Sequence, residues 1–167
     1  MLIEPLNRRH DRQSFDCGQA SLNLYLLRLA HQNADRDIGL TFVAVEDEVA
    51  TVIAGFYTLS GRILLPPAAP GEKLPPQGVH TALLARLAVS LEYQGRGLGR
   101  FLLFDALRRV LVASEQLAIY AVDVDALDER ARDFYLKYGF TPALDNPLRL
   151  FLPLKTLRPM FSLSISQ

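Results

Sequence analysis

The 167-residue chain is predicted to fold as a three-layer α/β or α+β sandwich. Two observations favour this fold class. β-branched and aromatic runs alternate with amphipathic helical patterns along the chain, and half of the residues are hydrophobic in a chain of single-domain length. The expected order after a first helix is hairpin, strand, helix, strand, helix and strand. We therefore expect one domain over residues 1–167, with a peripheral tail at 155–167.

An amphipathic helix is predicted over residues 21–37, with Ser21 as the residue that caps its start. The helix is expected to pack by a leucine-rich face. That face consists of Leu22, Leu26, Leu29 and Ala30, which recur at helical spacing.

Strands are predicted over residues 40–47 and 49–59, which are β-branched and aromatic and meet at an acidic bend that suits a hairpin. Residues 61–78 contain five prolines and three glycines, so we expect a long loop there. Residues 81–89 are nearly all apolar, which is typical of a strand buried on both faces.

The C-terminal half is predicted to alternate helices with strands at 117–125 and 148–157. One helix begins at the glycine-rich stretch of residues 95–100. The other has Asp128 and Glu129 in its first turn, where the helix dipole favours acids, and ends at Gly139. The apolar stripes are Leu103, Phe104, Leu107, Val110 and Leu111 in the first helix, and Ala131, Phe134, Tyr135 and Tyr138 in the second.

Composition excludes several classes of protein. The formal net charge is zero, so the bulk charge gives no reason to expect nucleic acid or an anionic membrane as partner. Cys17 is the only cysteine and the three histidines are scattered, so neither an internal disulfide nor a metal site is expected. No apolar run is long enough to cross a bilayer and the start lacks the core of a signal peptide. We expect a cytoplasmic protein without a membrane partner.

Three glycines alternate with other residues at 94–100, QGRGLGR, where a strand passes into a helix. Free backbone N–H groups at such a helix start form a ready anion site, and Arg96 and Arg100 add charge. The stretch fits neither a dinucleotide fingerprint nor a P-loop, because both need glycine at position 100. The alternative is a tight turn whose glycines only relieve backbone strain.

The QGRGLG stretch resembles the Q/R-x-x-G-x-G/A signature of the GNAT N-acetyltransferase superfamily. The resemblance implies a central mixed, mostly antiparallel sheet flanked by helices, with acetyl-coenzyme A (acetyl-CoA) as co-substrate. It implies that a splayed strand contacts the pantetheine arm and that backbone amides hold the pyrophosphate. The implied coenzyme-binding residues are Leu87, Ala88 and Val89 in the strand, and Gln94, Gly95, Arg96, Gly97, Leu98, Gly99 and Arg100 in the glycine stretch.

The same resemblance makes Tyr135, in FYLKYGF, the acid that protonates the departing thiolate. A tyrosine pKa of about 10, above the 8.5 of a thiol, suits that task at neutral pH. Taken alone, a tyrosine on an apolar stripe is more often part of a core. Glu92 lies near the glycine stretch, but a solvated loop acid is the better interpretation, and we assign no general base.

Residues 15 to 154 resemble a narrower branch, the GNAT toxins of type II toxin–antitoxin modules, which acetylate the α-amine of aminoacyl-tRNA and block translation. Such an amine titrates near 8, against about 10.4 for lysine, so it needs little help from a base. Ser90 and Asp125 depart from the branch's usual Asp and His. Arg86, Arg8 and Arg9 are the candidate tRNA contacts.

The branch also implies two protein partners, a ribbon-helix-helix antitoxin and a second copy of the chain in a homodimer. Two alternatives stay open. One is a GNAT enzyme that acetylates a small-molecule amine or a protein N-terminus. The other is a non-catalytic module that binds coenzyme A or a protein partner.

Overall fold

The computed structural model describes residues 1–66 and 73–162. Its strands are β1 (Leu2–Pro5), β2 (Leu40–Val45), β3 (Gly55–Leu64), β4 (Val79–Val89), β5 (Ala121–Asp125), β6 (Thr141–Pro142) and β7 (Arg149–Pro153). Its helices are α1 (Ala20–Leu24), the π-helical η1 (Tyr25–Leu29), α2 (Ala30–Asp35), the 3-10 turn η2 (Leu91–Tyr93), α3 (Leu98–Ala113), α4 (Glu129–Lys137) and α5 (Leu154–Ser162).

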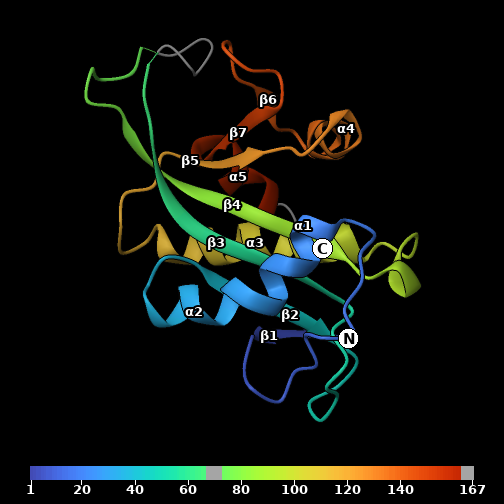
Figure 1. The fold of residues 1–167 in the computed structure, drawn as a ribbon. Helices are drawn as coiled ribbons and strands as arrows, with labels where there is room; N and C mark the ends of the chain where they lie inside the picture. The colour runs from blue at the N-terminus through green and yellow to red at the C-terminus, as the bar shows by residue number, and fades with distance from the viewer. Residues whose placement is uncertain (67–72, 163–167) are drawn as a thin grey trace. The chain divides into compact units, whose positions relative to one another are not determined.

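The described strands form one sheet in the order β1-β2-β3-β4-β5-β7-β6 (Figure 1). Antiparallel pairing joins β1 to β2, β2 to β3, β5 to β7 and β6 to β7. β4 and β5 run parallel, with Thr81 opposite Ala121 and Leu84 opposite Val124. The predicted mixed, mostly antiparallel sheet with helices is therefore confirmed.

The chain divides into two compact units, each built from separate stretches of sequence. Unit 1 comprises Met1–Ser60 and Ala85–Ala106. Of the described residues, unit 2 holds 61–66, 73–84 and 107–162. Residues 67–72 of the predicted loop and 163–167 of the predicted tail lie outside the described residues.

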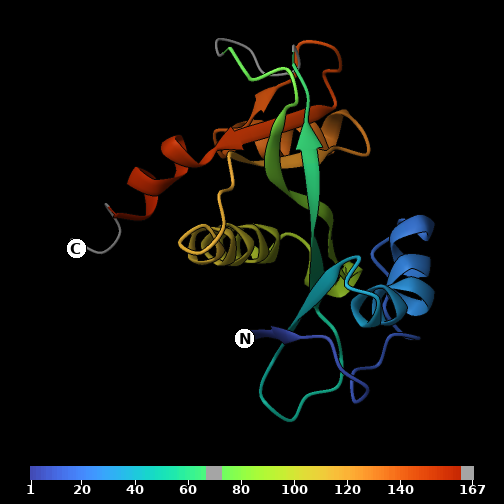
Figure 2. The same cartoon turned by 90° about the vertical axis from the view of Figure 1, so that its left-hand side faces the viewer.

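Unit 1 packs its helical segment against the hairpin. In Figure 2 the blue helices of residues 20–35 lie beside β2, against which α2 packs. Phe56 is the centre of this core, with the ring of Phe15 edge-on at 5.3 Å and that of Tyr25 stacked at 6.4 Å between centroids. Burying aromatic rings in this way contributes both apolar area and ring geometry.

The predicted first helix is interrupted by a π turn. Helix α1 begins at Ala20, so the prediction of Ser21 as the cap is wrong: Gln19 is the N-cap and makes no side-chain capping bond. The chain turns at Gly18, whose positive φ of 86° lets the helix start earlier than expected. The wider turn of η1 also rotates Leu29 off the apolar face, so that it is 46% exposed while Ala30 stays buried.

Unit 2 has its own apolar cluster of Leu64, Leu74, Ala121 and Phe151. Helix α4 starts at the N-cap Asp128, whose carboxylate accepts the Ala131 N–H at 2.8 Å, so Asp128 precedes the first turn rather than lying in it. Residues 154–157, predicted as strand, belong to α5, which buries Leu154 and Leu157.

Several strand boundaries differ from the prediction. β3 begins only at Gly55 and runs on to Leu64, into the predicted loop, while β5 begins four residues later than expected, at Ala121. β1 and β6 were not predicted, because each is too short for a hydrophobic pattern. β6 pairs through only Thr141 and Pro142.

Burial also differs from two predictions. In β4 only Thr81, Leu84 and Ala88 are buried, so this strand is less deeply buried than its nearly continuous apolar sequence predicts. The buried stripe of α3 is shifted by one position from the predicted one, because Phe104 and Leu111 are only half-buried. The buried side chains of α3 are Leu98, Leu102, Leu103, Ala106, Leu107 and Val110.

Candidate active site

The glycine stretch forms a turn between η2 and α3 that only glycine adopts easily. Gly95 has φ 77° and Gly97 has φ 81°, both in the left-handed region. A Cβ added at either glycine would meet nothing within 4 Å. Backbone conformation, rather than lack of space, therefore requires glycine here. Left-handed residues at every second position turn successive N–H groups toward one side, which makes an anion-binding concavity.

The backbone amides in the middle of this turn have no acceptor within the described chain. Gln94 N–H donates to the Leu91 carbonyl at 3.4 Å, and Phe101 N–H donates to the Gly97 carbonyl at 3.1 Å. Within residues 1–66 and 73–162, the amides between them, from Gly95 to Arg100, donate to no acceptor. They lie at the N-terminus of the 16-residue α3, where the helix dipole favours an anion.

Gln94, unlike the glycines that follow it, donates hydrogen bonds within the protein through its side chain. Its side-chain Nε2 donates to the Val89 carbonyl at 2.9 Å and to the Cys17 carbonyl at 3.1 Å. The side chain thus contacts the backbone of β4 and of the segment before α1. Its role as a coenzyme-binding residue stays a prediction.

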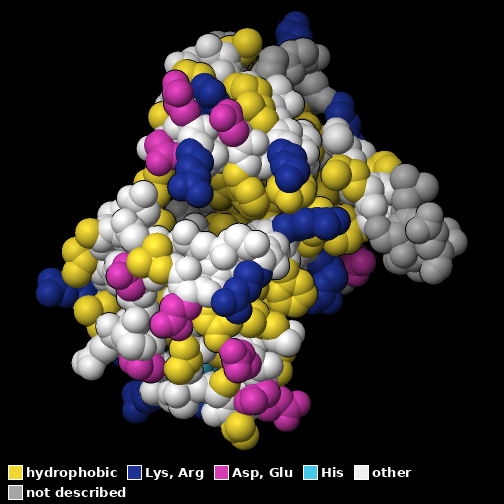
Figure 3. Space-filling model, turned by 90° about the vertical axis from the view of Figure 1, so that its right-hand side faces the viewer, with side chains coloured by type: hydrophobic (Ala, Val, Ile, Leu, Met, Phe, Trp, Pro, Cys, Tyr) yellow, Lys and Arg dark blue, Asp and Glu magenta, His cyan; other side chains and the backbone are white. Residues whose placement is uncertain are grey.

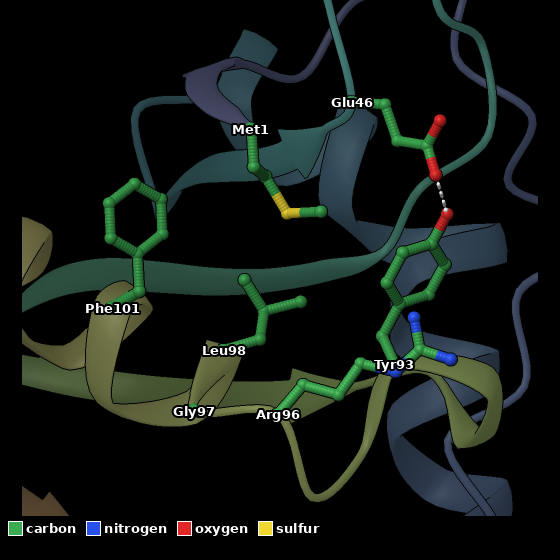
Figure 4. A pocket seen from close by; sticks show the side chains of 7 residues that line it. All are labelled: Met1, Glu46, Tyr93, Arg96, Gly97, Leu98 and Phe101. Atoms are coloured by element: carbon green, nitrogen blue, oxygen red, sulfur yellow. Dashed lines mark hydrogen bonds between the residues drawn. The ribbon is translucent and has the colours of Figure 1, made fainter.

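A pocket of about 400 Å³ adjoins the turn (Figure 4). The Tyr93 hydroxyl donates to Glu46 at 2.5 Å, and this bond raises the Tyr93 pKa. The Arg96 guanidinium lies over the Tyr93 ring, 5.5 Å from its centroid. The pocket is lined by Met1, Glu46, Tyr93, Arg96, Gly97, Leu98 and Phe101. The sequence pattern did not indicate it, because Met1 and Glu46 are far from the glycine stretch along the chain.

The strand before the turn extends past its last β5 partner where the coenzyme arm is expected, and the Val89 carbonyl there accepts from Gln94 Nε2. β4 pairs with β5 only from Thr81 to Leu84. Leu87, Ala88 and Val89 continue β4 beyond its last partner in β5. Unpaired backbone groups on such an edge are suited to hydrogen-bond an extended ligand.

Tyr135 lies in α4 of unit 2 and is 6% exposed. Its ring contacts Phe134 and Phe140 edge-on, with centroids 5.1 and 5.4 Å away. Burial raises the pKa of Tyr135 far above its ordinary value. The phenol is therefore protonated throughout the physiological range, as a proton donor must be.

Unit 2 also contains a charged cluster that the sequence pattern did not predict. Asp123 is fully buried, and its Oδ2 accepts from Arg62 Nη1 and Arg149 Nη2, each at 3.3 Å. Arg62 also bonds both oxygens of Asp125, which lowers the Asp125 pKa. An aspartate within an apolar strand was the available signal, since a buried charge needs a partner.

The candidate tRNA-contacting arginines have different surroundings. All three are exposed; Arg86 lies over the Tyr25 ring at 4.6 Å, and Arg9 forms an ion pair with Glu4. Glu92 is exposed as well, as expected of a solvated acid. Figure 3 shows one face on which basic, acidic and apolar side chains are interspersed, consistent with a net charge of zero.

The described part of the chain offers neither a membrane span nor a metal site. No helix within it is long and apolar enough to cross a membrane. No group of three or more His, Cys, Asp or Glu side chains there is arranged to hold a metal ion.

Comparison with known proteins identifies the family. Residues 37–142 match the acetyltransferase (GNAT) domain. A tRNA-acetylating toxin from Mycobacterium tuberculosis is 36% identical over 152 residues, which is 90% of each chain. The solved structure of AtaT complexed with acetyl-methionyl-tRNAfMet is 31% identical, with TM-score 0.87 over 96% of this chain and 98% of that one.

A third similar protein is a Tyr-to-Phe mutant of the AtaT toxin bound to the C-terminus of the antitoxin AtaR. It is 30% identical, with TM-score 0.83 over 96% of this chain and 97% of the solved one. The present chain belongs to the GNAT acetyltransferase family, in the branch that contains these toxins.

Proposed function

We propose that this protein is an acetyl-CoA-dependent N-acetyltransferase that acetylates the α-amine of aminoacyl-tRNA and so blocks translation. The row of amides from Gly95 to Arg100, at the start of α3, donates to no acceptor in the part of the chain that the structure describes and carries the first half of this proposal. The similarity to tRNA-acetylating toxins supports the second half. Acetyl-CoA enters as a co-substrate, and the reaction needs no metal ion.

The proposed roles follow from the geometry of each unit. The amides from Gly95 to Arg100 bind the donor's pyrophosphate, and β4 at 87–89, beyond its last β5 partner, hydrogen-bonds the pantetheine arm through backbone groups other than the Val89 carbonyl. The amine attacks the thioester carbonyl, and the C–S bond breaks. Tyr135 then gives its phenolic proton to the coenzyme thiolate. The α-amine is partly neutral at pH 7 and attacks as the free base. The proton that its nitrogen sheds after the attack goes to solvent, and the Tyr135 phenolate regains a proton from solvent.

Partners and location are proposed from the same similarity. An antitoxin of the ribbon-helix-helix class would cover the toxin, as the antitoxin AtaR binds AtaT through its C-terminus. We also propose a homodimer, cytoplasmic action, and acceptor contacts by Arg86, Arg8 and Arg9. Arg86 is available for such a contact, because its guanidinium lies over the Tyr25 ring, donates to the Ala85 carbonyl and forms no ion pair within residues 1–66 and 73–162.

The test combines induced expression with analysis of charged tRNA. The expected result is growth arrest, together with N-acetylated aminoacyl groups on a subset of tRNAs; Tyr135→Phe should produce neither. Normal growth with unmodified tRNA would remove the toxin function. Release of coenzyme A with polyamines or peptide N-termini, and without RNA, would instead favour a small-molecule or protein acceptor. Coenzyme binding with no acetylated amine would indicate a non-catalytic module.

A further inference from the structure

The glycine turn needs a fixed geometry, yet little holds it in its middle. The space beside Gly95 and Gly97 is open to at least 4 Å from where a Cβ would lie, and their amides make no bond within the described residues. Glycine-rich backbone of this kind loses much conformational entropy when it is ordered. The turn must therefore be held from its ends. Helix α3 holds one end, and Gln94 is at the other.

Both hydrogens of the Gln94 amide reach backbone carbonyls from separate parts of unit 1. One goes to Val89, at the end of β4, and the other to Cys17, 77 residues earlier in the chain. The Leu91 N–H, in η2, donates to the Asp16 carbonyl at 2.9 Å. The segment of residues 15–19, which we call the 15–19 loop, thus bonds once to η2 and once to Gln94 at the start of the glycine turn.

The 15–19 loop is itself rigidly held. Asp16 Oδ1 accepts from Gly18 N–H and Asn23 Nδ2, both at 2.9 Å, and these bonds lower the Asp16 pKa. Asn23 Oδ1 accepts the Cys17 N–H at 3.0 Å. The ring of Phe15 anchors the loop in the core against Phe56. The carbonyl that receives Gln94 therefore has a defined position.

We propose that Gln94 is a positioning residue and that the 15–19 loop is a structural part of the donor site. Gln94 connects the loop to the glycine turn and so holds the amides from Gly95 to Arg100 in the arrangement that binds a pyrophosphate. The identity of the ligand rests on the proposed function, but the connection itself is in the structure. It gives the FDCGQ stretch a role that the sequence pattern alone does not assign.

The test separates donors that contain a pyrophosphate from donors that lack it. In Gln94→Met the side chain keeps its length but loses both donated bonds. We expect the KM for acetyl-CoA to rise about tenfold with kcat nearly unchanged, which is the signature of lost binding rather than lost chemistry. The KM for acetyl-pantetheine, which has no pyrophosphate, should change by less than about twofold.

Three further variants sharpen the comparison. Gln94→Arg retains N–H donors and should restore most of the acetyl-CoA affinity. Asn23→Ala removes the Asn23 hydrogen bonds that hold the 15–19 loop, so it should weaken the binding of acetyl-CoA but not that of acetyl-pantetheine. This test does not depend on whether Gln94→Met folds. Gln13→Met is the matched control and should match the wild type, because Gln13 is exposed and its side chain makes no hydrogen bond within the described residues.

Equal losses with both donors would overturn the proposal, because they would indicate a general structural role. Unchanged acetyl-CoA affinity in Gln94→Met and Asn23→Ala would overturn it as well. Failure of the wild type to bind acetyl-CoA, measured by calorimetry, would overturn the proposed function itself. That result differs from the others, since it does not depend on any variant.

Discussion

Tyr135 is a buried phenol whose burial sets its chemistry. The rings of Phe134 and Phe140 exclude water from part of the tyrosine ring, and burial raises the pKa of its hydroxyl. The same burial would suit a purely structural tyrosine. Only a substitution that removes the hydroxyl and leaves the ring distinguishes the two roles.

Tyr135→Phe should lower kcat by about 10² to 10⁴-fold, the range for loss of a general acid. Coenzyme affinity and the melting temperature should change little, because the ring still fills its site. Tyr138→Phe, beside the same helix, is the matched control and should retain most of the rate. A Tyr135→Phe enzyme with wild-type kcat would exclude the acid role.

The pH dependence of the rate follows from the same residue. Since burial raises the pKa of Tyr135, its proton is present at every pH up to and beyond 10, and no loss of activity from tyrosine ionisation should occur below that pH. The rate should instead rise through the pKa of the acceptor amine, near 8. Measurement of kcat/KM between pH 6 and 10 checks this, and a fall centred near pH 8 would contradict it.

Asp125 gives a prediction for acid stability. Arg62 lowers the Asp125 pKa, so the ion pair stabilises the fold above the unfolded-state pKa of about 3.9 and stops doing so as the pH falls through the lowered value. Asp125→Asn should therefore cost up to about 1 kcal/mol at pH 7, since the side chain is largely exposed, and almost nothing near pH 2. Urea unfolding at both pH values measures it; an equal cost at both would refute the ion-pair explanation.

At the scale of elements, the glycine turn allows a matched pair of substitutions. Gly97→Ala forces a left-handed alanine, which costs about 1 to 2 kcal/mol, and should weaken acetyl-CoA binding. Gly61→Ala, in β3, adds a Cβ that also meets nothing within 4 Å, but its φ is not positive. Gly61→Ala should therefore be neutral or slightly stabilising. Calorimetric titration with acetyl-CoA and thermal melts compare the two.

The helices and turns also show which parts of the structure could be predicted from the sequence. Long periodic segments such as α3 and the glycine stretch could be predicted, because their patterns are local. The π turn at Tyr25–Leu29 could not, since its residues have ordinary helical spacing and tertiary packing decides its width. The partners of Gln94 could not be predicted either, because a hydrogen bond across 77 residues leaves no local pattern. The position of Asp123 within an apolar strand is a sign of a buried charge, but its arginine partners could not be predicted from the sequence.

At the scale of the whole molecule, a net charge of zero constrains how an RNA substrate is held. The three candidate arginine contacts would neutralise few phosphates, so the affinity for aminoacyl-tRNA should fall less with salt than that of proteins with many phosphate contacts. Between about 50 and 200 mM salt we expect a loss well below 10³-fold. Arg86→Gln should reduce the salt slope by about one, and an unchanged slope would exclude a phosphate contact by Arg86.

The amide row at Gly95–Arg100 has a consequence for control of the reaction. Backbone N–H groups bind a pyrophosphate whether or not the coenzyme carries an acetyl group. Free coenzyme A has the same pyrophosphate as acetyl-CoA. On the proposed assignment, the coenzyme A released by the reaction competes with acetyl-CoA for the same amides. The rate of acetylation then follows the ratio of acetyl-CoA to coenzyme A, so the metabolic state of the cell sets how fast the protein works.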